Sequence, residues 1–387
     1  EGRYEIQHLL RQYIAEKERI ASLDGGTALD DWRARHADYY LRLVGERAAA
    51  ICSGMAAPVL QALLQDLGNI ERAWDWAAEQ GAHPLLALAL PGIVNLWEVR
   101  GAFEEAAQRF AIAAWRVRSQ CEDPPSAEAL ALWGALVAAQ AHFLNLQEQH
   151  AEALALAEQV IARVSDAQVR ARAYLQGGRA LWYREERAVA RDYLEEALAL
   201  AAPTETLCVL AKGSLLLGRM AAQAGNYGEA TLRAEAAWQH YQLLGERRGQ
   251  AAALELFGEI AAGQGQYSEA VERYWQGLRY FRDMAEAGAV QRVLNALTAL
   301  LLGLGRFVDA QAVLKELAQD FEAQHNVSGA ALVMGWQGCL ALRLGNWPEA
   351  GRQLQSALTL ARTLGDRRWE GRVLGWLSQL ALRRGQR

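Results

Sequence analysis

Proline and cysteine are scarce in this sequence, and neither sign of charge is in large excess. The 387 residues include 7 prolines and 4 cysteines, and the formal net charge is −5. So few prolines, with only short polar gaps between apolar segments, argue against disordered tails and long linkers. The cysteines lie far apart without a CxxC pair, so we interpret them as four buried thiols in a reducing cytosol. The acidic balance argues against nucleic-acid binding through a broad basic face.

Long apolar runs and the common motifs of catalysis are also missing. No run of about eighteen uninterrupted apolar residues occurs, and the longest candidate, residues 293–304, is predicted to be a buried repeat helix. No GxxxxGK[ST], HExxH, GxSxG or paired Cys/His set is present. We interpret the seven histidines as ordinary surface or core residues. We therefore expect no enzyme, no metal and no cofactor in this sequence, no membrane contact, and a cytoplasmic location.

A six-residue pattern returns every forty residues in the second half of the chain. Glycine, any residue, aromatic, any residue, acid, alanine stands at 225–230, 265–270, 305–310 and 345–350. So strict a period indicates a repeat array. The glycine is typical of the left-handed residue that ends a helix, and the acid of the first turn of the next helix. The predicted unit is a helix, a tight turn and an antiparallel helix.

A clear copy at 101–106 and two degraded copies at 148–153 and 185–190 extend the array toward the N-terminus. The alanine is present in all seven copies, as Ala106, Ala153, Ala190, Ala230, Ala270, Ala310 and Ala350. Seven positions before the turn, most copies have a second small residue: Ala141, Gly178, Gly218, Gly258, Thr298, Gly338 and, in a final half copy, Ser378. These residues should let the two helices of a unit interlock. The last first helix should stand alone as a cap with a polar outer side.

This order of small, aromatic, acidic and alanine residues resembles the tetratricopeptide repeat (TPR). That repeat has about 34 residues, whereas this array adds six where units join, as at 244–248 and 364–368. The longer spacing with an LGE or LGD linker resembles the subgroup found in bacterial regulatory ATPases and some eukaryotic scaffold proteins. The resemblance implies an all-α fold, a right-handed α-solenoid of TPR-like helix-turn-helix repeats, with about seven and a half repeats over residues 83–387.

The first 82 residues lie outside the repeat register. Residues 3–7 alternate as a short strand would, and helices are predicted at 8–20, 30–51 and 57–79. Residues 2–13, GRYEIQHLLRQY, resemble the tail of the winged-helix domain that follows the nucleotide-binding core of STAND regulators, the signal transduction ATPases with numerous domains. Residues 35–40 and 66–74 resemble the segment that joins that domain to the repeats. We expect a winged-helix remnant at 1–22 and an N-terminal helical module at 23–82.

In STAND regulators the repeats are the sensor, and an inducer or partner bound there releases the ATPase to oligomerise. The resemblance therefore implies the sensor arm of a STAND-type ATPase or transcriptional regulator. Its expected partners are an inducer peptide, protein or small molecule in the concave groove, and the ATPase domain of the same chain. Because the sequence opens with Glu1-Gly2-Arg3 rather than methionine, we expect that ATPase to precede residue 1. The alternative is a passive scaffold that holds protein partners without a switch.

The family pattern also indicates which side chains face the groove. The first helix of each unit lines the concave side. Four of its positions point into the groove, about thirteen, ten, six and three residues before the turn glycine. The candidate ligand-binding residues are Asn95, Glu98, His142, Asn145, Arg172, Arg179, Trp182, Lys212, Arg219, Glu255, Glu259, Arg292, Asn295, Arg372 and Gln379.

Charge is unevenly spread along these positions. A basic stretch lies beside an acidic pair, namely Arg172, Arg179, Lys212 and Arg219 next to Glu255 and Glu259. Arginines presented in this way suit carboxylate or phosphate groups, because the planar guanidinium bonds both oxygens. In the alternative interpretation they pair with neighbouring glutamates and only solvate the groove.

Tryptophan is abundant, with thirteen residues. Four lie on predicted first helices, where an aromatic ring can stack on a ligand: Trp97, Trp182, Trp336 and Trp376. Trp336 and Trp376 occupy equivalent positions forty residues apart, so we predict that they pack between repeats, and Trp182 remains the candidate for ligand contact. Burial is expected for Trp74, Trp76, Trp115, Trp133, Trp238 and Trp275.

Overall fold

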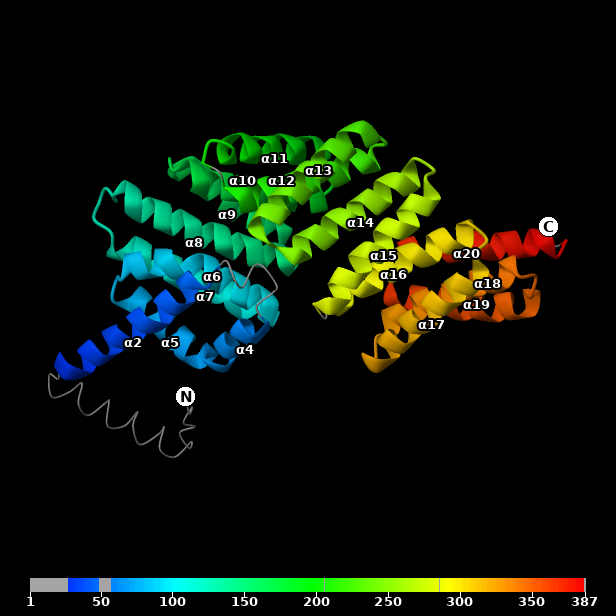
Figure 1. Ribbon diagram of the computed structural model, residues 1–387, viewed down its shortest axis with the longest axis horizontal. Helices are drawn as coiled ribbons and strands as arrows, with labels where there is room; N and C mark the ends of the chain where they lie inside the picture. Colours follow the sequence, from blue (N-terminus) through cyan, green and yellow to red (C-terminus); the bar gives the residue numbers. More distant parts are fainter. Residues whose placement is uncertain (1–26, 49–56, 205, 285, 386–387) are drawn as a thin grey trace, which may run out of the picture. The chain divides into compact units, whose positions relative to one another are not determined.

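The described chain is helical throughout, and its helices follow one another as antiparallel pairs (Figure 1). The computed structural model describes residues 27–48, 57–204, 206–284 and 286–385, and within these ranges it has eighteen helices and no strand. This confirms the predicted all-α fold class of helix-turn-helix repeats.

Three helices, α2 (Thr27–Glu46), α4 (Ala57–Gln65) and α5 (Leu67–Glu79), precede the repeats. Helix α2 packs against α5 and against the first repeat helix. The single helix predicted at 57–79 is wrong in one respect, because Asp66 interrupts it with a backbone at φ −93° and ψ 8°. Aspartate favours such non-helical conformations. The predicted winged-helix remnant, the strand at 3–7 and the helix at 8–20 lie outside the described residues.

The helices from α6 onward alternate between first and second helices of the repeats. The first helices are α6 (His83–Arg100), α8 (Ala127–Leu146), α10 (Ala167–Tyr183), α12 (Leu207–Gln223), α14 (Arg247–Gly263), α16 (Ala287–Gly303), α18 (Val327–Arg343) and α20 (Arg367–Arg383). The second helices are α7 (Phe103–Gln120), α9 (His150–Arg163), α11 (Arg187–Ala201), α13 (Tyr227–Leu244), α15 (Tyr267–Asp283), α17 (Phe307–Ala323) and α19 (Trp347–Leu364).

The chain forms two compact units. Unit 1 comprises residues 1–216 and 243–246, and unit 2 comprises residues 217–242 and 247–387. The N-terminal helices and the repeats as far as α11 belong to unit 1, whereas α14 to α20 belong to unit 2. Salt bridges join the N-terminal helices to the repeats in unit 1, where Arg109 of α7 lies 2.9 Å from Asp75 and 3.2 Å from Glu71 of α5.

The turns between paired helices have the predicted left-handed residue. Gly225, Gly265, Gly305 and Gly345 have φ between 72° and 80°. In the two degraded copies the same conformation is taken by Glu148 and Glu185, with φ of 63° and 66°. A residue with a Cβ atom is strained in this region, by roughly 1–2 kcal/mol.

Small residues allow each helix pair to approach closely, as predicted. The alanines that end the repeat pattern are all 0% exposed: Ala106, Ala153, Ala190, Ala230, Ala270, Ala310 and Ala350. A Cβ atom added to Gly178, Gly258 or Gly338 would lie 2.6–2.9 Å from a side chain of the second helix in the same unit. These contacts are too short for any larger residue, so the interlocking geometry depends on them.

The outer side of the last helix differs from the prediction. Leu374 and Leu382 of α20 are 41% and 70% exposed, so the expected polar outer side is wrong. The reason lies in the forty-residue period, because these positions correspond to Met334 and Leu342 in α18, which a second helix follows. Helix α20 therefore retains the apolar pattern of an internal first helix.

Helix α8 is a longer apolar element than α16, which contains most of the 293–304 stretch singled out from the sequence. It is long and apolar enough to cross a membrane, but 67% of the relevant window is buried inside the structure. Neighbouring helices thus cover most of its surface, which is typical of a core helix.

Two predictions about buried side chains are wrong. Trp115 is 69% exposed, because the buried stripe of α7 runs through Phe110, Ala114 and Val117. Cys208 is exposed in the first turn of α12, whereas Cys339 is buried and Cys121 is half-buried; Cys52 lies outside the described residues. Burial of Trp336, at 5% exposure, is confirmed.

The fully buried alanine predicts a large effect of added volume. Ala270→Leu should lower the free energy of unfolding by about 1–3 kcal/mol, because the new side chain wedges α15 away from α14. Urea denaturation followed by circular dichroism measures the change. The matched control Ala299→Leu, on the exposed side of α16, should change it by less than about 0.5 kcal/mol. Equal effects of the two variants would contradict the interlocking geometry.

The strained turn residue predicts the opposite effect. Glu185→Gly should raise the free energy of unfolding by about 0.5–1 kcal/mol, because glycine adopts positive φ without the Cβ clash. Glu196→Gly, the same change in the middle of α11, should lower it by about 1 kcal/mol. Thermal denaturation of the two variants checks both signs, and a loss of stability in Glu185→Gly would contradict the assignment.

Candidate ligand-binding surface

All fifteen candidate residues lie on first helices, in α6, α8, α10, α12, α14, α16 and α20. Hydrogen bonds and ring contacts link many of them from one first helix to the next. The links fall into one group in unit 1 and another in unit 2.

The unit 1 group begins with a buried histidine. His142 Nε2 lies 3.2 Å from Glu98 Oε2, across α8 and α6. Burial lowers the pKa of His142, and the positive charges of Lys212 and Arg179 lower it further, against the opposing effect of Glu98. His142 is thereby held neutral at neutral pH.

Asn145 is also buried and engaged within the fold. Its Nδ2 donates to the backbone carbonyl of Gln176 at 3.0 Å, and its Oδ1 lies 3.1 Å from His150 Nδ1. Gln176 itself is 8% exposed and was missed by the sequence reasoning. A polar residue on the apolar side of α10 was the signal that could have found it.

Three cations of unit 1 are half-buried: Arg172, Arg179 and Lys212. The guanidinium of Arg179 lies 6.0 Å from the ring of Tyr183, and its charge adds to burial in lowering the pKa of His150. Within the described chain, neither Arg172 nor Arg179 forms an ion pair. Trp182 lies half-buried one turn after Arg179 on the same helix. Positive charge therefore gathers on α10 and α12 without an acidic partner for the two arginines.

The unit 2 group is centred on a buried carboxylate. Glu255 on α14 has a side chain only 3% exposed. Arg292 on α16 donates from Nε to Oε1 at 2.6 Å and from Nη2 to Oε2 at 3.0 Å, and Arg219 on α12 donates from Nη2 to Oε2 at 3.2 Å. We call these three residues the Glu255 clamp. For Arg219 the structure shows the pairing with glutamate that the alternative interpretation expected, and Arg292 pairs with the same glutamate.

Glu259 lies one turn after Glu255 on α14. Burial raises its pKa and the charge of Glu255 adds to the rise, whereas Arg219 and Arg292 oppose it. The same burial raises the pKa of the Tyr274 hydroxyl on α15, and the Tyr274 ring packs on Gly258. The two glutamates of α14 therefore lie in a poorly solvated environment, whereas the Arg292 side chain is 53% exposed.

The remaining candidates lie toward the end of unit 2 or, for Asn95, in unit 1. Asn295 Oδ1 accepts a hydrogen bond of 2.7 Å from Trp336 Nε1. The guanidinium of Arg372 lies 5.6 Å from the Trp336 ring and 5.5 Å from the Trp369 ring. Gln379 is exposed and Asn95 half-buried. Trp369 forms one aromatic cluster with Trp336 and Trp376. It was missed because it lies in the first turn of α20, outside the candidate positions.

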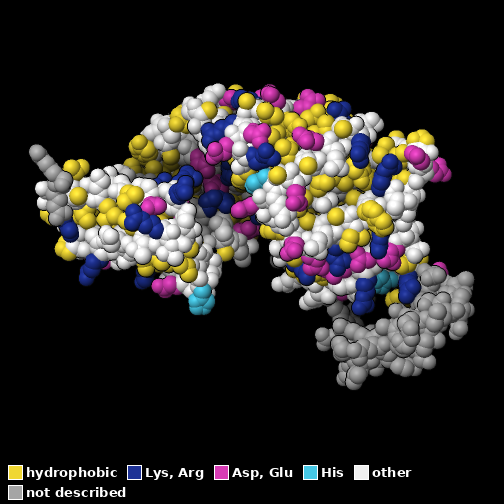
Figure 2. Space-filling view, turned by 180° about the vertical axis from the view of Figure 1, so that it is seen from behind, with side chains coloured by type: hydrophobic (Ala, Val, Ile, Leu, Met, Phe, Trp, Pro, Cys, Tyr) yellow, Lys and Arg dark blue, Asp and Glu magenta, His cyan; other side chains and the backbone are white. Residues whose placement is uncertain are grey.

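The surface offers charge in a mixed pattern. Figure 2 shows Lys and Arg side chains interspersed with Asp and Glu over the face in view. Among the residues that the structure describes, no group of three His, Cys, Asp or Glu side chains is arranged to hold a metal ion.

Solved structures share this fold, among them the two that follow. A STAND protein with a tetratricopeptide repeat sensor from Pyrococcus horikoshii matches with a TM-score of 0.65 and 14% identity, over 85% of this chain and 49% of its own. A Rap protein complexed with competence and sporulation factor matches with a TM-score of 0.53 and 12% identity, over 90% of this chain and 99% of its own. No protein-family model and no curated protein matches the sequence.

These likenesses establish the fold, since identities this low carry no more than that. The structural neighbours are TPR-type helical-repeat proteins. This chain spans about half the length of the STAND protein, at 49%. The expected solenoid fold is thus confirmed.

The raised pKa of Glu259 predicts a pH-dependent effect. Just above its ordinary pKa of 4.5 the folded chain holds a proton that the unfolded chain has lost. The free energy of unfolding therefore falls as pH rises through that range. Glu259→Gln cannot ionise, so it should gain stability relative to wild type between about pH 4 and pH 7.

Urea denaturation of both proteins at about pH 4 and pH 7 checks this result. Glu322→Gln, an exposed position on α17, is the matched control and should show no such gain. A variant less stable than wild type at neutral pH would mean that attraction between the Glu259 carboxylate and Arg219 exceeds the cost of burial.

Proposed function

We propose that this chain is the ligand- or protein-binding sensor arm of a STAND-type signal transduction ATPase or transcriptional regulator. It recognises its inducer on the polar side of the first helices. The observation that carries the proposal is the group of Arg172, Arg179 and Lys212 on α10 and α12, in which neither arginine has an ion pair within the described chain. The fold shared with a STAND protein that has a TPR sensor supports the same assignment.

The chemistry of this group favours an anionic ligand. A guanidinium presents its donors in a planar fork that fits carboxylate and phosphate oxygens. Because the three cations are half-buried, hydrogen bonds to them are less screened by water than at an open surface. Trp182 on the same helix adds an aromatic face for stacking or for an apolar side chain. An acidic peptide, an acidic protein segment or a small anion fits these features.

A repeat array suits sensing because each unit contacts mainly its neighbours. A ligand that touches several first helices can favour one arrangement of the interfaces over another, within the limit of its difference in affinity for the two. In this proposal the change reaches an ATPase domain of the same chain through the N-terminal helices, where Arg109 ties α7 to α5. A cytoplasmic location and a role in transcription regulation belong to the same proposal.

The second candidate function is a passive scaffold that holds protein partners. The Glu255 clamp favours it, because there the arginines are already paired and stabilise the array rather than wait for a ligand. The coding sequence upstream of Glu1 separates the two functions. A nucleotide-binding domain there supports the sensor, and its absence from the full gene supports the scaffold.

Removing the unpaired cations should weaken anion binding. For Arg172→Ala with Arg179→Ala, a fluorescent hexaglutamate peptide should bind at least about tenfold more weakly, because each charge-assisted hydrogen bond contributes about 1.5–3 kcal/mol. The measurement is fluorescence anisotropy at physiological salt, with helix content checked by circular dichroism.

The control carries the same change in charge on another face. Arg118→Ala with Arg187→Ala alters exposed positions of the second helices α7 and α11. This variant should bind the peptide as wild type does. Equal weakening in both double variants would show non-specific attraction and remove Arg172 and Arg179 from the proposed site.

A further inference from the structure

His150 is the first residue of α9, and the residues beside it hold it in one tautomer. Asn145 Nδ2 donates to the backbone carbonyl of Gln176 at 3.0 Å and lies 3.4 Å from its side-chain Oε1. These contacts orient the Asn145 amide, so that its Oδ1 lies 3.1 Å from His150 Nδ1. Because that oxygen can only accept, the proton of the neutral imidazole is on Nδ1 and the lone pair is on Nε2.

The Nε2 atom of His150 is left for a ligand. The bond to Asn145 is the one hydrogen bond that His150 forms within the described chain. His150 is half-buried, and its Nε2 is not among the buried atoms that lack a partner, so it is reachable from solvent. The ring stacks on Tyr183 of α10, with centroids 4.7 Å apart and planes 8° from parallel. A protonatable nitrogen is thus held in a fixed place at the surface of unit 1.

Positive charge lies beside this nitrogen. The Arg179 guanidinium lies 6.0 Å from the Tyr183 ring on which His150 stacks. Helix α9 packs against α8 and α10. The charged or titratable groups that face His150 are Arg179 and Tyr183 from α10 and Glu148 from the preceding turn, while α8 contributes the uncharged Asn145. Burial and Arg179 lower the pKa of His150 against the opposing effect of Glu148, so the free chain holds it neutral near pH 7.

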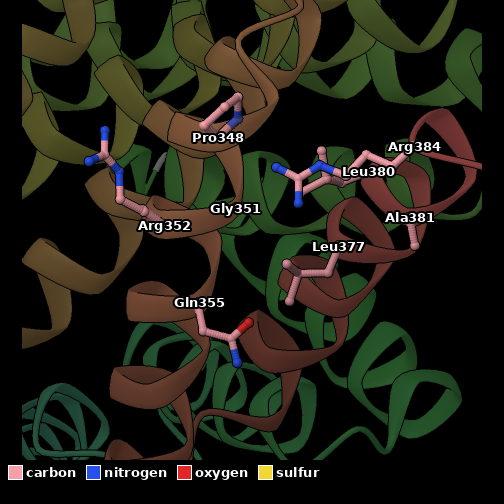
Figure 3. A pocket seen from close by; sticks show the side chains of 8 residues that line it. All are labelled: Pro348, Gly351, Arg352, Gln355, Leu377, Leu380, Ala381 and Arg384. Carbon is pink, nitrogen blue, oxygen red and sulfur yellow. The ribbon is translucent and has the colours of Figure 1, made fainter. Parts of the chain in front are cut away.

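Arginines also line a pocket of about 500 Å³ in unit 2, between α19 and α20 (Figure 3). There Arg352 forms an ion pair with Glu349, and Arg384 donates to the backbone carbonyl of Trp347 at 2.6 Å. Both guanidiniums are therefore engaged within the fold, and none of the lining residues is a histidine. Arg179, in contrast, has no ion pair within the described chain and has a histidine beside it.

An anion bound beside Arg179 changes the balance of charge at His150. It offsets the positive charge that disfavours the imidazolium ion. An anionic oxygen next to Nε2 is repelled by the lone pair but accepts a hydrogen bond once Nε2 is protonated. Such charge-assisted bonds are roughly twice as strong as neutral ones. Protonation of His150 and binding of the anion therefore favour each other to the same extent.

We propose that His150 is a further ligand contact of the group formed by Arg172, Arg179 and Lys212. It takes up a proton from solvent when a carboxylate ligand binds beside Arg179, and it donates a hydrogen bond from Nε2 to a carboxylate oxygen. The proton returns to solvent when the ligand leaves, and no covalent bond to carbon changes. This inference rests on the proposed function and adds the regulation of its site, which binds acidic ligands more tightly at lower pH.

Calorimetric titration with the hexaglutamate peptide, in two buffers of different ionisation enthalpy at pH 6.5, measures the protons taken up on binding. Glutamate side chains, with an ordinary pKa of about 4.3, are ionised at this pH. Wild type should take up at least about 0.3 proton per peptide and bind at least about threefold more tightly at pH 6 than at pH 8.

The informative variant is His150→Asn. Its amide nitrogen can still donate to Asn145 Oδ1, but no group takes the place of Nε2. Proton uptake should fall below about 0.1 per peptide, while binding at pH 8 should equal that of wild type. The matched control is His240→Asn, which changes another half-buried histidine, on α13 in unit 2, whose pKa is also lowered by burial. This control should take up as many protons as wild type.

The outcomes separate this inference from the proposed function. Peptide binding by wild type without proton uptake, or equal uptake by wild type and a folded His150→Asn, would overturn the role of His150 and leave the proposed binding function in place. Absence of peptide binding by wild type at both pH 6 and pH 8, at concentrations up to about 1 mM, would overturn both.

Discussion

The close approach of paired helices at a buried alanine is the contact on which the structure depends. The seven repeat alanines are 0% exposed. Glycines on the first helices leave room for a leucine side chain or a tyrosine ring of the second helix. Because interiors are packed at near-crystalline density, these small residues determine how near the two axes come. That spacing in turn fixes which side of each first helix remains for polar residues.

The polar side of the first helices has two different characters. In unit 2, Arg219 and Arg292 form salt bridges with the buried Glu255, and these bridges stabilise the contacts between α12, α14 and α16. A carboxylate this buried requires such partners, since a lone buried charge is strongly unfavourable. In unit 1, Arg172 and Arg179 have no acidic partner within the described chain. One sequence register thus yields a stabilising contact in unit 2 and two arginines without an ion pair in the described part of unit 1.

The fold was largely predictable from the sequence, because the glycine and alanine positions are rigid geometric requirements that recur at a fixed period. The candidate residues lie on first helices, as the repeat register predicts, for the same reason. Their partners were not predictable, since pairs such as His142 with Glu98 join residues 44 positions apart through packing angles that no local pattern encodes. Trp115 was misjudged because it lies off the buried stripe of α7. The outer side of α20 was misjudged because exposure there depends on which neighbouring helix is present.

The constant spacing of the unit 2 interfaces bears on how such an array changes during evolution. Gly258 and Gly338 contact equivalent residues of their second helices, Tyr274 and Leu354, although these two repeats differ widely in sequence. Recombination that removes or duplicates a forty-residue block joins surfaces of the same shape, so the product remains in register. The number of units can therefore vary among descendants of this gene while the hydrophobic core of each unit persists.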